Sequence, residues 1–505
     1  MTRTQKTMSL VALLAALGLG AADWSGNRNK PFDLELWPPS CFRPVTPPAS
    51  PLALRTSDPK LAAAFAWAKA QALDYVFPAS AYDDPVGDWY EAALPGRFAF
   101  CMRDVSHQAA GAQALGLAAF NLNMLRKFAA GLSASRAYCS YWEIDKWNRP
   151  APVDYKSDRD FLYNLPANFD VLDACWRQFR WTGNKAYLEE PAFLNFYEQS
   201  ATSYIRAWDN DGDGVPDHRR GDGNQGLGSY DEGPLSDRTA IGADLLAAEF
   251  RAFRSYAGIL RGRGDSAGAD ALEAKAAGLR DMFYKKWWDP KLKRFAGLML
   301  EGGALNFDDM FWYGLFPLYF GFLRPGLERE AILDRLTGSD ADGIEVESYL
   351  PEVFYRYGRD DAAYAEILKL SDPGKKRREY PEVPFALVGA IAAGTMGLEP
   401  DAAAGIVATR SRLTAATAWA ELARVPVLGN VVEVRHDGRT RSTLTNVSGP
   451  ALDWRAVFDG ARATLAVDGK QVEASRGTDE AGRSVCWVTV TVPPGKAVYV
   501  SIRIP

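Results

Sequence analysis

The feature that most constrains the fold is a series of apolar, helix-forming segments that come in pairs between residues 58 and 396. Short breaks such as Gly183-Asn184 and Gly262-Arg263-Gly264 suit tight turns between antiparallel helices. Two early helices begin at Asp58-Pro59 and just after Asp104. The later predicted segments are 165–181 with 185–208, 236–260 with 268–288, 307–320 with 327–336, 347–357 with 361–370, and 384–396. We therefore predict a mainly α protein in which six helical hairpins close into an (α/α)6 barrel over residues 58–412.

The segments on either side of this region have a different composition. Residues 23–57 are rich in Pro, Trp and Asn and predict an extended lead-in. Residues 413–505 contain strand-like runs such as 431–434, 485–492 and 498–502, separated by turns with Gly, Asp and Pro. They predict a small C-terminal all-β, sandwich-like domain that braces the barrel.

The first 22 residues have the pattern of a secretory signal peptide. Arg3 and Lys6 precede an apolar run at 10–19, and small residues follow it before Asp23. The run is too short to remain as a membrane anchor, and we expect a secreted or periplasmic protein without one.

Composition excludes several classes of function. With 58 basic and 63 acidic residues, the net charge of -5 leaves no basic field for nucleic acid. Five scattered Cys and three His make a zinc site implausible, and we expect no cofactor. The oligomeric state does not follow from the sequence.

The Arg103-Asp104 pair leads directly into a long helix. Asp104 could simply be a residue that favours a helix start, because helix N-termini attract negative charge. Loops rich in acids and aromatic rings recur along the barrel, however, and cleavage of a glycosidic bond needs two carboxyl groups and neither metal nor histidine. We therefore predict a glycoside hydrolase with Asp104 as the general acid.

The second carboxyl group is expected in the segment Arg377-Arg378-Glu379-Tyr380-Pro381-Glu382. We favour Glu379 as the base and expect it to face Asp104, because Glu382 has an alternative role at a helix start. Arg377 and Arg378 could keep a base ionised, bind an acidic sugar or form a solvated basic turn. The side chains expected to bind the sugar are Arg103, His107, Trp142, Glu143, Asp231, Glu232, Asp308, Trp312, Glu347, Arg378 and Glu382. Asp231 and Glu232 could instead cap a helix.

An acidic turn at 209–217 resembles the start of a calcium loop. Asp209, Asp211, Asp213 and Asp217 supply oxygen atoms, but Arg220 stands where such a loop has its closing Glu. A plain turn rich in Asp and Asn is the alternative.

Four motifs resemble the α-L-rhamnosidase family and its relatives among the six-hairpin glycosidases. Cys101-Met102-Arg103-Asp104, followed by Gly111-Ala112-Gln113, is similar to the family's Cys-Pro-x-Arg-Glu and Gly-Asp-Ala-Gln motif. The other three are similar to its Asp-Gly-x-Val-Pro-Asp loop, its Tyr-Leu-Leu-Pro and Ala-Tyr helix pair, and its closing helix; they lie at 213–217, 349–364 and 388–397. The resemblance implies that Asp104 holds the place of the general acid, that Glu379 lies near that of the base, and that hydrolysis inverts the anomeric carbon. Asp104 replaces the family's Glu and Ala112 its Asp, so the resemblance does not fix rhamnose as the sugar.

Other functions remain open from the residues alone. The chain could be a non-catalytic glycan-binding protein on the same scaffold, or a uronate-directed hydrolase or lyase that uses Tyr380 with Arg378. A sugar epimerase would need paired histidines, and the barrel region has only His107 and His218. The sugar, the linkage and exo or endo action do not follow from the sequence.

Overall fold

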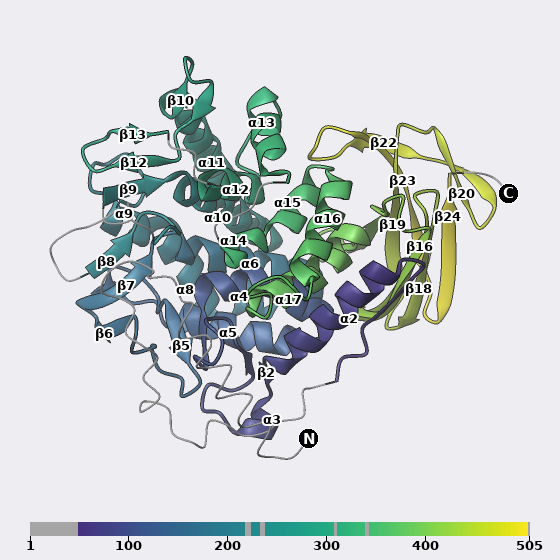
Figure 1. Cartoon of the computed structure of the whole chain (residues 1–505), viewed down its shortest axis with the longest axis horizontal. Helices are drawn as coiled ribbons and strands as arrows, with labels where there is room; N and C mark the ends of the chain where they lie inside the picture. The colour runs from purple at the N-terminus through teal and green to yellow at the C-terminus, as the bar shows by residue number, and fades with distance from the viewer. Residues whose placement is uncertain (1–48, 218–223, 233–237, 308–310, 339–342, 503–505) are drawn as a thin grey trace.

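The computed structural model describes residues 49–217, 224–232, 238–307, 311–338 and 343–502 (Figure 1). Within these ranges, six helices pack side by side in a closed ring, each against the next and the last against the first. These inner helices are α4 (Met102–Ala114), α6 (Ala167–Thr182), α10 (Ala243–Gly262), α12 (Phe311–Tyr319), α15 (Leu350–Arg356) and α17 (Glu382–Gly389), which continues as the π-helix η6 (Ala390–Thr395). The ring confirms the predicted (α/α)6 barrel.

A second set of helices surrounds this ring, and each leads along the chain into the next inner helix. They are α2 (Pro59–Asp74), α5 (Ala118–Ala130), α8 (Pro191–Gln199), α11 (Ser266–Lys286), α13 (Leu327–Leu336) and α16 (Asp360–Ser371). Burial separates the two layers: eleven residues of α4 are buried, but only four of the much longer α11 are. An inner helix needs apolar or small residues on most sides, whereas an outer helix needs one apolar stripe. Shorter helical segments are α3 (Ala79–Tyr82), η3 (Ala134–Arg136), α7 (Ala186–Glu189), η4 (Ser200–Tyr204), α9 (Ile205–Trp208) and α14 (Ile344–Glu347).

Local sequence signals set several of these helix ends. The Asp58 carboxylate accepts hydrogen bonds from the backbone N–H groups of Lys60 and Leu61, at 3.0 and 3.2 Å, so it caps α2 as predicted. Gly183 ends α6 with a φ of 70°, a left-handed conformation that glycine adopts without a steric cost.

Short strands at one end of the barrel lead into three of the inner helices. Strand β4 (Ala99–Cys101) directly precedes α4, β9 (Thr239–Gly242) precedes α10, and β7 (Asp160–Asn164) comes shortly before α6. The partner of β4 is β5 (Glu143–Asp145), with Cys101 opposite Glu143. The remaining short strands are β2 (Val76–Phe77), β3 (Trp89–Tyr90), β6 (Tyr155–Ser157), β8 (Asn224–Leu227), β10 (Trp288–Asp289), β11 (Arg294–Phe295), β12 (Leu298–Leu300) and β13 (Leu305–Asn306). The three strands that precede α4, α6 and α10 belong to three separate small sheets.

The ring closes where α17 lies against α4, through two glycines. A Cβ atom on Gly111 would lie 2.0 Å from the carbonyl oxygen of Phe385, and one on Gly389 would lie 3.1 Å from the backbone nitrogen of Gly111. Gly111 has no room for a side chain and an added methyl group at Gly389 would be tightly crowded, so the two backbones approach more closely than ordinary helix pairs do. This contact sets the position of the last inner helix relative to the first.

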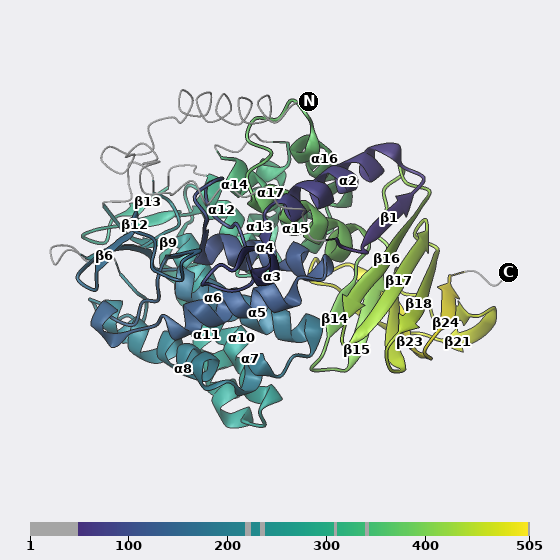
Figure 2. The same cartoon turned by 90° about the horizontal axis from the view of Figure 1, so that it is seen from below.

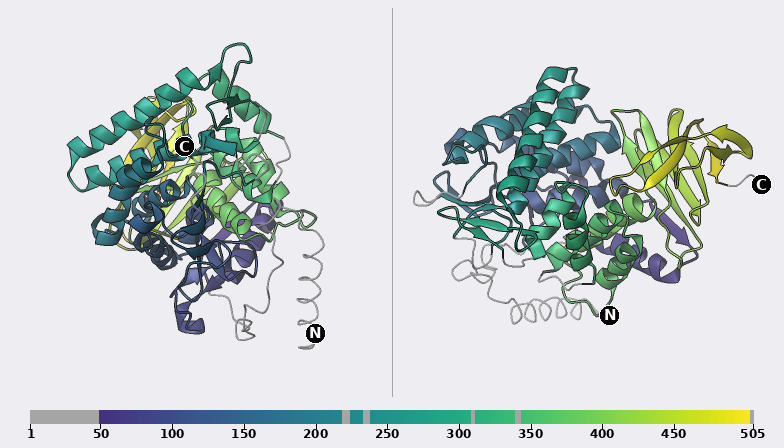
Figure 3. Two further views of the ribbon diagram at one scale, coloured as in Figure 1. Left: turned by 90° about the vertical axis from the view of Figure 1, so that its left-hand side faces the viewer. Right: turned by 90° about the horizontal axis from the view of Figure 1, so that it is seen from above.

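The C-terminal part is a sandwich of two sheets that lies to one side of the barrel (Figure 3). The seven-stranded sheet has the order β1-β16-β17-β18-β24-β20-β21, and the five-stranded sheet the order β14-β15-β19-β23-β22. The strands are β1 (Ala53–Thr56), β14 (Glu399–Asp401), β15 (Ile406–Arg410), β16 (Trp419–Val427), β17 (Asn430–Asp437), β18 (Arg441–Ser448), β19 (Leu452–Asp459), β20 (Thr464–Val467), β21 (Lys470–Glu473), β22 (Ser475–Thr478), β23 (Ser484–Val492) and β24 (Lys496–Ser501). Along β17 buried and half-buried residues alternate, as expected for a strand with one face in a core.

Three strands of this sandwich come from outside residues 413–505. Strands β14 and β15 precede residue 413, and β1 precedes the whole barrel yet pairs with β16, with Ala53 opposite Ala423 (Figure 2). The sandwich therefore extends beyond the predicted boundary at both ends of the barrel. The predicted lead-in contributes a strand because β16 offers an unpaired edge.

Ion pairs and hydrogen bonds join the sandwich to the barrel. The Arg439 guanidinium lies 2.9 Å from the Asp360 carboxylate of α16, and the Trp181 indole N–H donates to the carbonyl oxygen of Pro426 at 2.8 Å. Among the described helices, none combines the length and the apolar character needed to span a bilayer.

We expect Gly111→Ala to lower the free energy of unfolding by at least about 2 kcal/mol, because the new methyl group would overlap the backbone of α17. Chemical denaturation would measure the change. Gly278→Ala is the matched control: Gly278 also lies within a helix, α11, but its added methyl group would meet no atom within 4 Å. The control should be neutral or stabilising by up to about 1 kcal/mol. An equal effect of the two substitutions would contradict the role of Gly111 in closing the ring.

Candidate active site

Buried carboxyl groups occupy the first turns of four inner helices at the same end of the barrel. They belong to Asp104 of α4, Asp170 of α6, Asp244 of α10 and Glu382 of α17. All four are buried, with exposed fractions of 5% or less. Helix N-termini favour negative charge, so the barrel collects acids at this end.

Two of these acids, Asp104 and Glu382, are in contact. Their carboxyl groups lie within hydrogen-bonding reach of one another, and both are withdrawn from solvent, with exposed fractions of 2% and 0%. The Asp104 Oδ1 atom lies 3.7 Å from the Arg103 guanidinium. Neither this oxygen nor the Oε2 atom of Glu382 accepts a hydrogen bond from the described residues. Buried polar atoms without a partner are rare and mark a place where another group binds or reacts.

The two acids hold protons more tightly than free carboxyl groups do. Burial, with the nearby Glu382 carboxylate, raises the pKa of Asp104 well above its ordinary value. Burial raises the pKa of Glu382 to about 7, although the positive charge of Arg103 opposes this rise. Two buried carboxylates in contact repel each other, so the pair keeps one proton near neutral pH.

His107 and Tyr349 contact the Glu382 side of the pair. The Nδ1 atom of His107 lies 3.2 Å from Glu382 Oε1, and the Tyr349 hydroxyl donates to the same oxygen at 3.5 Å. The rings of His107 and Tyr349 stack with their centroids 3.5 Å apart. Burial lowers the pKa of His107 to about 3, so its ring is neutral and orients Glu382 without adding charge.

The structure brings Glu382, not Glu379, to Asp104, which corrects the expected geometry. The Glu379 side chain is 54% exposed and pairs with the Arg378 guanidinium at 3.0 Å. Helix α17 begins at Glu382, two residues earlier than predicted, and its first turn directs that side chain into the barrel. Glu379 precedes the helix and stays at the surface.

Two further residues expected to bind the sugar have other partners. Arg378 donates to the carbonyl oxygen of Ser371 at 2.8 Å and lies over the Trp67 ring. Glu347 pairs with Lys369 and Lys375, and these ion pairs do not include either acid of the central pair. The structure thus gives both residues structural contacts at the edge of the site.

Glu143 and Trp142 lie in the wall of the site. The Glu143 carboxylate pairs with the Arg97 guanidinium at 2.7 Å. Burial raises the pKa of Glu143, and the nearby Asp104 carboxylate adds to this rise. Trp142 is buried edge-to-face against Tyr163. Glu143 therefore remains a candidate for substrate contact, whereas Trp142 packs in the core.

The remaining predicted contacts are Asp231, Glu232, Asp308 and Trp312. Asp231 is buried and Glu232 half-buried, in the segment between β8 and β9. Asp308 and the side chain of Trp312 lie outside the described residues.

The sequence analysis missed Asp170 and Glu345. The Tyr230 hydroxyl donates to the Asp170 carboxyl group, and the Arg103 guanidinium lies 5.8 Å from the centre of the Tyr230 ring. Burial raises the pKa of Asp170 to about 8. Glu345 lies in α14, which packs against α17, and its charge acts on both Asp104 and Glu382. The available signal for Asp170 was its place near the start of the predicted helix 165–181.

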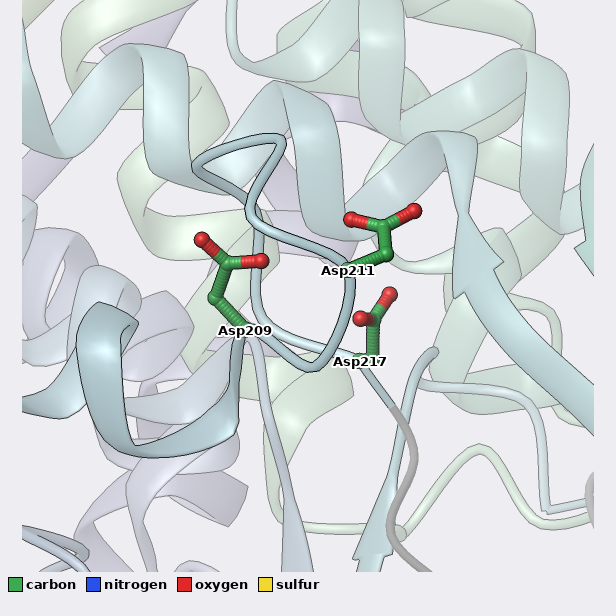
Figure 4. Close-up of side chains that lie close together, drawn as sticks. All are labelled: Asp209, Asp211 and Asp217. Carbon is green, nitrogen blue, oxygen red and sulfur yellow. The ribbon is translucent and has the colours of Figure 1, made fainter.

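The acidic turn follows α9, and Figure 4 shows the side chains of its Asp209, Asp211 and Asp217 close together. Asp209, Asp211 and Asp217 each offer an oxygen atom within 4.8 Å of the others. Backbone N–H groups already donate to these carboxylates, and Asp213 accepts from the Val215 N–H. Burial, with the neighbouring carboxylates, raises the pKa of Asp217 to about 6. Carboxylate oxygens suit calcium, and calcium binding here stays a prediction.

The comparison with known proteins supports the fold. No protein-family model and no curated protein matches the sequence. A GH78 family rhamnosidase of Bacillus sp. GL1 matches 80% of this chain and 41% of its own at 14% identity, with a TM-score of 0.58. An α-L-rhamnosidase from Dictyoglumus thermophilum matches 90% of this chain and 50% of its own at 13% identity, with a TM-score of 0.58. A kojibiose phosphorylase from human microbiome matches 87% and 63% at 10% identity, with a TM-score of 0.52.

These structures define the class of fold. The chain is a six-hairpin α/α barrel with a C-terminal β domain, as in the α-L-rhamnosidases, and it spans at most half the length of the two rhamnosidases. The predicted resemblance is therefore confirmed for the fold.

The raised pKa of Glu382 predicts how stability depends on pH. In the folded chain Glu382 keeps its proton up to about pH 7, whereas in the unfolded chain the same side chain loses its proton near pH 4.5. The stability from this proton is complete below about pH 4.5 and lost as the pH rises through 7. Between pH 4.5 and 8, the free energy of unfolding of Glu382→Gln should fall by about 3 kcal/mol less than that of the wild type. Denaturation at a series of pH values would measure this difference. Glu379→Gln, at an exposed site, should keep the wild-type dependence, and a wild-type dependence in Glu382→Gln would contradict the assignment.

Proposed function

We propose that the chain is an exported glycoside hydrolase that cleaves an oligosaccharide or a glycan side chain with Asp104 and Glu382. The observation that supports this proposal most is the contact of these two buried acids at the N-terminal ends of α4 and α17 in a six-hairpin barrel. A protonated and an ionised carboxyl group side by side are the two groups that glycoside hydrolysis needs. Asp104, predicted as the acid, keeps that role, and Glu382 takes the role first given to Glu379.

The proton distribution assigns the two roles. Burial and the Glu382 carboxylate raise the pKa of Asp104 well above its ordinary value, so we assign the shared proton to Asp104, which donates it to the glycosidic oxygen as the bond to the anomeric carbon breaks. Glu382 is the carboxylate that removes a proton from the attacking water. His107 and Tyr349 hold its Oε1 atom, which leaves the orphan Oε2 atom available to the water. After one turnover Asp104 has lost its proton and Glu382 has gained one from the water. Transfer of this proton from Glu382 to Asp104 restores the starting state of the pair.

The pair must open when a sugar binds. Inverting enzymes keep their carboxyl groups about 6.5–9.5 Å apart and retaining enzymes about 5–5.5 Å, both wider than a direct contact. We propose that the sugar and a water molecule enter between Asp104 and Glu382 and that hydrolysis inverts the anomeric carbon, as the resemblance implies.

The charge around the pair favours a neutral sugar over a uronate. Asp170, Glu143 and Glu345 add carboxyl groups near Asp104 and Glu382. Arg103 and Arg97 supply positive charge, but each already faces a carboxylate of the site. A uronate would add a further negative charge to this set, which costs free energy.

The lyase alternative is also disfavoured. A tyrosine acts as a base only after it loses its proton, and burial with the nearby Asp104, Glu382 and Glu345 raises the pKa of Tyr380 well above its ordinary value. Arg378, its proposed partner, lies over Trp67 instead.

We expect Asp104→Asn and Glu382→Gln each to lower kcat on a cleavable substrate by at least about 100-fold, because each removes one proton-transfer group. A panel of chromogenic glycosides, uronides included, would identify that substrate. Glu379→Gln is the control and should stay within a few fold of the wild type. Full activity in Asp104→Asn or Glu382→Gln would rule out that residue, and glycan binding without any product would favour the non-catalytic alternative.

We expect the first product to have the opposite anomeric configuration to the substrate. Proton NMR recorded during early turnover, before mutarotation, would show which anomer forms. Retention would refute the water-mediated role of Glu382 and assign it as a nucleophile.

A further inference from the structure

Glu345 supplies a third carboxyl group to the same cluster. It forms no hydrogen bond with Asp104 or Glu382. It lies in the first turn of α14, and it is 8% exposed. Its Oε1 atom accepts from the Arg377 guanidinium, whereas its Oε2 atom is buried and has no hydrogen-bond partner among the described residues. Glu345 is therefore a carboxylate with one paired and one unpaired oxygen.

The position of Glu345 follows from the packing of two helices. Helix α14 lies against α17, whose first turn carries Glu382 (Figure 1). Arg377, its counter-ion, sits five residues before Glu382 in the loop that leads into α17, with a φ of 59°. A left-handed φ at a non-glycine residue costs free energy and persists where the surroundings fix it. The Arg377–Glu345 ion pair is such a constraint.

The negative charge of Glu345 acts on three groups of the site. It raises the pKa of Asp104 and of Glu382, in each case as a smaller contribution than burial. It also raises the pKa of Tyr380, which is affected by Asp104 and Glu382 as well. The other charged or titratable groups that face the pair are Arg103, His107, Glu143 and Tyr349.

We propose that Glu345 is a positioning residue whose negative charge, held in place by Arg377, keeps one proton on the Asp104–Glu382 pair at neutral pH. Repulsion between Glu345 and a doubly ionised pair disfavours loss of the shared proton. Without this charge the pair would lose its proton at a lower pH, while burial would still raise the pKa of both Asp104 and Glu382. The inference deepens the proposed function and rests on it, but the proton itself can be observed without turnover.

The experiment is an infrared pH titration of the full chain, following the C=O stretch of protonated carboxyl groups. We expect Glu345→Gln to move the titration of the pair down by about one pH unit. Asp104→Asn and Glu382→Gln identify the bands of the pair. Glu345→Asp, which keeps the charge, should restore most of the shift.

Glu347→Gln is the matched control because Glu347 lies in the same helix and is also buried, but pairs with Lys369 and Lys375. It should leave the titration unchanged. A wild-type titration in Glu345→Gln, or an equal shift in Glu347→Gln, would overturn the inference. If the chain hydrolyses no glycoside and the shift is still observed, the proposed function fails while the coupling stands. If turnover occurs, its pH profile should move in the same direction as the titration.

Discussion

The close contact between the first and the last inner helix is the constraint on which the site depends. Gly111 and Gly389 allow the backbones of α4 and α17 to meet, because a side chain at Gly111 would overlap the backbone of α17 and one at Gly389 would be tightly crowded. Because Asp104 and Glu382 lie in the first turns of these two helices, the closure of the ring also brings the two acids together. The geometry of the acidic pair is thus a consequence of how the barrel closes.

Burial gives this pair its chemical character. An isolated carboxyl group in water is ionised at neutral pH, but burial raises the pKa of both Asp104 and Glu382. Arg103 limits this effect, and neutral His107 fixes the orientation of Glu382 without adding charge. One proton shared by two acids provides both a donor and an acceptor, which is the combination that hydrolysis of a glycosidic bond requires.

The sequence predicted the barrel because helix pairs and short turns are local signals. It also indicated Asp104 as a candidate acid, since an Arg-Asp pair directly before an apolar helix is visible in the chain itself, and that role stays a prediction. It misplaced the partner because the choice between Glu379 and Glu382 depends on where α17 begins, and helix ends shift by a few residues from sequence alone. Glu345 could not be found, because its proximity to the pair comes from the packing of α14 against α17. The pairing of β1 with β16 was missed for the same reason: it joins segments at opposite ends of the barrel.

The most direct test of the account is a crystal structure of the Asp104→Asn variant with an uncleaved oligosaccharide bound. The account predicts that the amide introduced at position 104 lies within hydrogen-bonding distance of a glycosidic oxygen, about 2.6–3.2 Å, with a water molecule between the anomeric carbon and Glu382. An oligosaccharide bound elsewhere on the chain, or bound here with Glu382 directed away from the anomeric carbon, would contradict it.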